Sequence, residues 1–124
     1  MAQIKKTVIK EKNISVFSVH GNFSLDKLLN EIDRLCATDT TLHSLWDFTN
    51  GVFPTIKASD VEIIIEHTRK YVDIRKGGKS AIVVSRDLGY GMARMYDTLS
   101  ECKDSPVEYR VFRDINEATN WIEK

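Results

Sequence analysis

A glycine-containing turn after an apolar strand combines groups that could bind an anion. Asp87 follows the apolar run Ala81–Val84 and is a natural helix N-cap, and Gly89 and Gly91 fall in the first turn of the helix that it would start. Each glycine costs roughly 1 kcal/mol relative to alanine inside a helix, so the pair calls for a reason such as a closely approaching ligand. Backbone amides near the glycines could meet an anion, and the Arg94 guanidinium could complete the site.

The same turn also has a purely structural interpretation. The two glycines could let the helix pack tightly on a neighbour, while Arg94 pairs with a carboxylate such as Asp47. Asp87 would lie at the mouth of the site and repel an anion. The sequence leaves both interpretations open. The ligand-binding candidates are Trp46, Asp47, Asp87, Gly89, Tyr90, Gly91 and Arg94.

Trp46 and Asp47 stand near the carboxyl end of a strand predicted over residues 43–49, where they could border the same region as Tyr90. An aspartate there could orient Arg94 or act as an acid or base. General acid–base catalysis needs a positioned partner and a shifted pKa, and the sequence shows neither. A core tryptophan and a structural ion pair are therefore the favoured interpretation.

Metal and nucleophilic chemistry lack their usual residue patterns. His20, His43 and His67 fall in different predicted elements without a metal-ligand spacing, and neither Cys36 nor Cys102 has an evident histidine partner. No serine stands in a G-x-S-x-G setting. We predict no catalytic residue, no metal and no cofactor, and hence a protein that is not an enzyme. The 18 basic and 18 acidic residues give a net charge of zero, which argues against nucleic-acid binding.

The elements that must position these residues follow from hydrophobic periodicity. Strands alternating with amphipathic helices predict an α/β layered domain of about five strands and about four helices, with an N-terminal antiparallel hairpin and otherwise mostly parallel strands. The lysines of the first strand fit an edge strand that resists aggregation. Strands are predicted over residues 3–11, 13–20, 43–49, 79–84 and 107–113, and helices over 25–36, 59–76, 87–103 and from 114 onward.

Three segments resemble small bacterial proteins described as STAS-like or SpoIIAA-like. The segments are DFTNG, GGKSAIVVSRDLGYGMARMYDTLSE and VEYRVFRDINEATNWI. The D-L-G-Y-G-x-x-R-M-Y helix start, followed by V-F-R-D and E-A-x-x-W-I, carries most of the likeness. It covers the second half of the chain strongly and the first half only by topology. The resemblance implies a SpoIIAA-like fold and supplies little chemistry, because that family is mostly uncharacterised.

The resemblance also implies a mode of action. Anti-sigma-factor antagonists of this fold present a surface to a partner protein and are switched off by phosphorylation of a serine in a D-S-S-G-type signature. This chain lacks the signature, and its nearest hydroxyls are Thr55 and Ser59. Ser59 with Glu62 is already explained as a capping box, so Ser59 is a weak phosphorylation candidate.

The predicted interaction surface is apolar. Ile63 falls off the main stripe of the second helix and, with Val52 and Phe53 in the preceding loop, could form an exposed patch, unless that loop folds back over it. We therefore expect a single domain over residues 1–124 that binds a protein partner or a second copy of itself. The alternative is a carrier of a small apolar or anionic ligand near the Asp87–Arg94 helix start. The absence of a signal segment and of a long apolar run predicts a cytoplasmic protein without integral membrane association.

Overall fold

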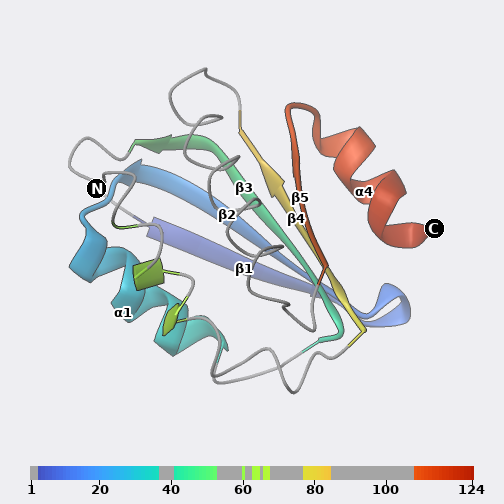
Figure 1. Cartoon of the computed structure of the whole chain (residues 1–124), viewed down its shortest axis with the longest axis horizontal. Coiled ribbons are helices and arrows are strands. Elements are labelled where there is room, and N and C mark those ends of the chain that lie inside the picture. The colour runs from blue at the N-terminus through green and yellow to red at the C-terminus, as the bar shows by residue number, and fades with distance from the viewer. Residues whose placement is uncertain are drawn as a thin grey trace.

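The described residues of the computed structural model form one five-stranded sheet with a helix on each face (Figure 1). They are residues 3–36, 41–52, 60, 63, 64, 66, 67, 77–84 and 108–124. The elements are β1 (Gln3–Ile9), a 3₁₀ turn (Lys10–Lys12), β2 (Ile14–Asn22), α1 (Leu25–Cys36), β3 (His43–Val52), β4 (Lys79–Val83), β5 (Glu108–Phe112) and α4 (Ile115–Glu123).

The strands lie side by side in sequence order, β1-β2-β3-β4-β5. β1 is antiparallel to β2, and every other neighbouring pair is parallel, which confirms the predicted hairpin and the parallel remainder. Two continuous helices, α1 and α4, are found in the described part of the chain, fewer than the four predicted. Five described residues between 60 and 67 are helical and belong to the predicted second helix, whereas the third, over 87–103, lies outside the described residues.

The hairpin turn is longer than the predicted tight turn at Lys12 and Asn13. β1 ends at Ile9, two residues early, because Lys10–Lys12 form a 3₁₀ turn closed by a bond from the Asn13 amide to the Lys10 carbonyl at 3.2 Å. Asn13 adopts φ 57° and ψ 43°, a left-handed conformation that asparagine tolerates better than most residues. The predicted strand over 3–11 is therefore wrong in its last two residues.

β3 is longer than predicted. It continues past residue 49 to Val52 because β2 continues beside it, with His20 paired to Asn50 and Asn22 paired to Val52. These ladder pairs override the turn signal of the Asn-Gly dipeptide. As a result, Trp46 and Asp47 lie inside a strand instead of at its end, and Val52 is a strand residue instead of a loop residue.

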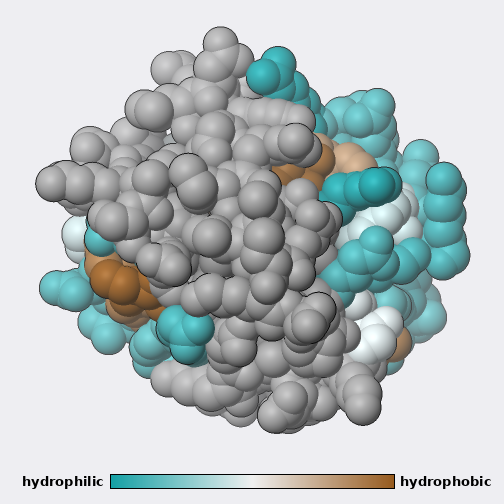
Figure 2. Space-filling model, in the orientation of Figure 1, coloured by the Kyte–Doolittle hydropathy of each residue, from teal (hydrophilic) through white to brown (hydrophobic). Residues whose placement is uncertain are grey.

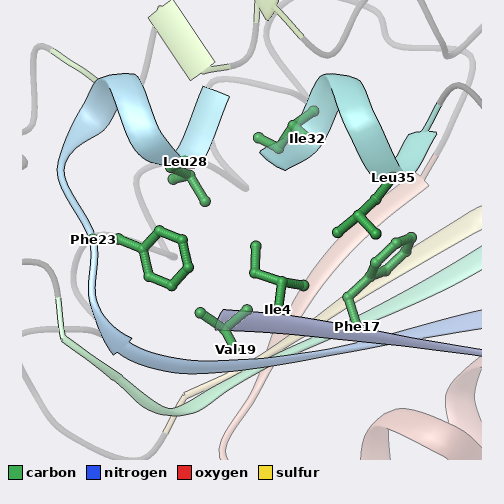
Figure 3. Close-up of a cluster of buried hydrophobic side chains, with 7 residues drawn as sticks. All are labelled: Ile4, Phe17, Val19, Phe23, Leu28, Ile32 and Leu35. Atoms are coloured by element: carbon green, nitrogen blue, oxygen red, sulfur yellow. The ribbon is translucent and has the colours of Figure 1, made fainter. Parts of the chain in front are cut away.

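The first core lies between α1 and the sheet (Figure 3). Ser24 starts α1: its hydroxyl oxygen accepts a bond from the Lys27 amide at 3.3 Å, and its carbonyl accepts one from the Leu28 amide. Leu28, Ile32 and Leu35, at helical spacing, point into the core. The buried members of this core are Ile4, Phe17, Val19, Phe23, Leu28, Ile32 and Leu35.

The second core lies on the opposite face, under α4. Asp114 caps this helix as predicted, its side chain accepting a bond from the Asn116 amide at 2.9 Å. At the other end, the Lys79 ammonium donates to the carbonyls of Trp121 at 3.0 Å and Lys124 at 3.2 Å, where the negative end of the helix dipole favours a cation. The buried members of this core are Ile14, Leu45, Ala81, Val83, Ala118, Trp121 and Ile122.

Candidate functional site

Asp47 stabilises an irregularity in the sheet. The pairing of β2 with β3 shifts between Ser18 and His20, so that two residues of β3, Phe48 and Thr49, lie opposite a single residue of β2. One carboxylate oxygen of Asp47 accepts bonds from the Thr49 amide at 3.0 Å and from the Thr49 hydroxyl at 2.6 Å. A bulge leaves a backbone amide outside the ladder, and this carboxylate satisfies it. Among the described contacts, Asp47 thus has a structural role.

Replacing Asp47 by alanine should lower the free energy of unfolding by about 1–3 kcal/mol, because a part-buried amide loses a charged acceptor. Asp47→Asn retains an oxygen that can accept from the Thr49 amide, so its loss should be smaller. Urea denaturation of both variants measures the difference. If both variants lost the same stability, the bulge contact would not be what Asp47 contributes.

Trp46 packs on the other face of the sheet from Asp47. Its ring stacks on Phe17 at a centroid distance of 4.1 Å and on Phe48 at 6.0 Å, against the core under α1. Successive side chains of a strand point to opposite faces, so Asp47 shares the face of Leu45, which packs under α4. These two neighbours, predicted as parts of one ligand site, are therefore divided between the two faces.

The turn from Asp87 to Arg94 lies outside the described residues. The strand before it, β4, is buried and ends at Val83, which pairs with Asp47, so the chain leaves the sheet beside the bulge. Open α/β sheets bind ligands where the strand order reverses. The five described strands follow one another without such a reversal.

The helical residues between 60 and 67, which we call the second helical segment, lie against α1 (Figure 1). Ile64 packs against the first core, and the His67 imidazole lies 2.8 Å from the Asp33 carboxylate of α1. Ile63 points away from these contacts and is 48% exposed. This is the outward direction that the helical spacing predicts for a residue next to the buried stripe.

The surface beside the second helical segment mixes apolar and charged groups. Figure 2 shows a brown, hydrophobic area in the region of α1 and this segment, bordered by teal residues. On α1, Arg34 donates to Glu31 at 2.8 and 3.1 Å, and this bond lowers the pKa of the Glu31 carboxyl. The pair therefore favours the folded state at neutral pH, and this contribution is lost as the pH falls through the folded-state pKa.

Phe53 and Ser59 lie outside the described residues, as do Gly89, Tyr90 and Gly91. Within the described ranges, no three histidine, cysteine or acidic side chains gather as a potential metal site. The described part of the chain contains no helix that is long and apolar enough to span a membrane.

No protein-family model matches the chain, and no curated protein matches it in sequence. Solved structures do match over nearly the whole length. An uncharacterized protein of the DUF3478 family with a SpoIIAA-like fold, from Shewanella loihica, is 16% identical with a TM-score of 0.60, over 98% of this chain and 93% of that one. An anti-sigma factor antagonist from Mycobacterium paratuberculosis is 14% identical with a TM-score of 0.64, over 98% and 96%.

A third match is the Bacillus cell fate determinant SpoIIAA in its phosphorylated form. It is 11% identical with a TM-score of 0.54, over 98% of this chain and 99% of that chain. At such identities the likeness establishes the fold, and this chain has the SpoIIAA-like fold that its sequence resemblance implies.

Proposed function

We propose that this protein is a non-enzymatic regulatory module that acts by binding another protein. The fold supports this proposal, because two of the similar structures are described as anti-sigma factor antagonists. The observation that carries it is the exposed Ile63 on a segment whose neighbouring residues, Ile64 and His67, are engaged with the first core and with α1.

An apolar side chain held outward on a fixed segment suits the centre of an interface. Ile63, at 48%, is the most exposed of the large apolar residues in the described ranges, and Ile115 follows at 43%. Protein interfaces commonly place apolar anchors inside a rim of polar groups. The charged side chain of Asp33, which contacts His67 of this segment from the supporting helix, fits such a rim. Val52 ends β3, and the prediction that Val52 and Phe53 belong to the same surface as Ile63 rests on their place in the sequence.

Ile63→Arg should weaken binding of a recovered protein partner by at least about tenfold, because a buried interface anchor becomes a charge. Its thermal stability should change little, since the side chain is exposed. Ile115→Arg is the matched control, being an exposed isoleucine on α4 at the opposite face of the sheet. The partner is immobilised on a sensor surface, and the affinity of each variant in solution for that surface is measured. Equal affinities of the two variants would contradict the proposed surface.

The partner in this proposal is a different protein, and a homodimer through the same surface is the other outcome of this experiment. The ligand-carrier alternative stays a prediction based on Gly89, Gly91 and Arg94, and so does phosphorylation at Ser59. A mass increase that is retained on denaturation and that maps to Ser59 would support phosphorylation at that residue.

A further inference from the structure

β1 is a long, regular edge strand. Among the described strands it ends the sheet order and pairs only with β2, in an unbroken register from Gln3 with His20 to Ile9 with Ile14. Its seven residues exceed the five of β5, the strand at the other edge. An edge strand presents a row of backbone amide and carbonyl groups to any extended chain that approaches it. β1 contains no proline, and its pairing with β2 has no bulge, so neither device blocks this edge.

Positively charged side chains are the feature of this edge that disfavours its pairing with another strand. Residues 3–10 carry three lysines and no acidic residue, although the whole chain has a net charge of zero. Lys5 is exposed on the face opposite α1. Lys6 points to the other face, where its ammonium donates to the Leu35 carbonyl at 2.9 Å and lies 5.7 Å from the centroid of the Phe17 ring. A proline or a bulge would exclude every strand, whereas lysines repel only basic ones.

We propose that the outer edge of β1 binds an extended acidic peptide segment as a sixth strand of the sheet. Backbone hydrogen bonds would supply the affinity, and carboxylates beside Lys5 would supply the selectivity. Exposed Gln3 and Thr7 flank Lys5 on the same face and leave room for the side chains of an added strand. This surface is distinct from the one around Ile63 and does not depend on it.

Like charges limit the registers in which a second copy of the chain could pair with this edge. The middle residue of Gln3–Ile9 is Lys6, so an antiparallel pair of β1 strands in its longest register sets Lys6 opposite Lys6. A shift by two residues in one direction sets Lys5 opposite Lys5, whereas the same shift in the other direction sets Thr7 opposite Thr7. Like charges directly opposite each other destabilise a strand pair. Two of these three registers of self-pairing are therefore disfavoured, whereas carboxylates opposite Lys5 would attract an acidic partner.

Fluorescence anisotropy with two labelled, end-blocked heptapeptides tests the proposal. One peptide alternates glutamate with valine, and the other alternates lysine with valine. The acidic peptide should bind about tenfold more tightly than the basic one, and added salt should reduce the difference. Lys5→Glu should remove or reverse this preference, whereas Lys27→Glu, at an exposed lysine of α1, should keep it. Lys5→Gln, which only removes the charge, should give an intermediate preference.

N-methylation of the acidic peptide tests whether it binds as an added strand. Two versions of the acidic peptide are N-methylated on alternate residues, one on the odd and one on the even positions. Only one set of amides would face β1, so one version should bind and the other should lose binding. Equal binding of the two methylated versions would overturn the proposal. So would equal binding of the acidic and basic peptides, a preference unchanged in Lys5→Glu, or self-association through β1 that the acidic peptide does not displace.

Discussion

Replacing Trp121 by alanine is expected to lower the free energy of unfolding by about 3–5 kcal/mol, the largest loss for any single α4 side chain. Trp121 is only 9% exposed and lies in the second core. Its ring contacts Phe112 at a centroid distance of 5.6 Å. The cationic groups of Lys79 and Arg110 lie 5.3 and 5.8 Å from its centroid, which adds cation–π attraction. The truncation therefore removes packing and electrostatic contacts together.

Equilibrium urea unfolding followed by far-UV circular dichroism measures this loss. The control is Ile115→Ala on the same helix, which should change stability by less than about 1 kcal/mol because Ile115 is 43% exposed. If Trp121→Ala were no more destabilising than the control, α4 would not be held on the sheet in the way its contacts indicate.

Phe17→Ala is expected to cost about 3–5 kcal/mol and to disturb Trp46. Phe17 is 3% exposed, lies in the first core and forms one end of the stack that continues through Trp46 to Phe48. Aromatic pairs contribute about 0.5–1.5 kcal/mol beyond the area they bury, so losing one end of the stack adds to the cavity cost. The Trp46 fluorescence should also shift to the red as water reaches the ring.

Recording the emission in a Trp121→Phe background isolates the signal of Trp46, the other tryptophan of the chain. Ser18→Ala is the matched control, since Ser18 neighbours Phe17 but faces the opposite side of β2. It should leave both stability and emission nearly unchanged. A blue shift in Phe17→Ala, or a loss of stability as small as that of Ser18→Ala, would mean that the stack does not support this core.

Local periodicity was sufficient for much of the fold. The spacing of Leu28, Ile32 and Leu35 is enough to predict the buried stripe of α1, and Asp114 is enough to predict the start of α4, because both signals reside within one or two helical turns. The unbroken apolar run Ala81–Val84 is the pattern of a strand buried on both faces, and these residues are buried in the structure. The helical spacing also predicted the outward direction of Ile63.

The features that the sequence did not predict depend on contacts between segments that are far apart in the chain. β3 extends to Val52 only because β2 continues beside it, and no signal within residues 50–52 shows this. The bond between Asp47 and Thr49 depends on a register shift between two strands. Asp33 and His67 stand on different helices, so no spacing in the sequence joins them. Trp46 and Asp47 were grouped by position, whereas strand alternation separates them.

Native mass spectrometry of the protein, purified gently from its own cells and compared with its denatured mass, distinguishes a bound protein partner from a bound small ligand. We expect a complex with another protein that dissociates on denaturation and is lost in Ile63→Arg but retained in Ile115→Arg. A monomer that carries a small non-covalent ligand, unchanged by Ile63→Arg, would contradict it and favour the ligand-carrier alternative.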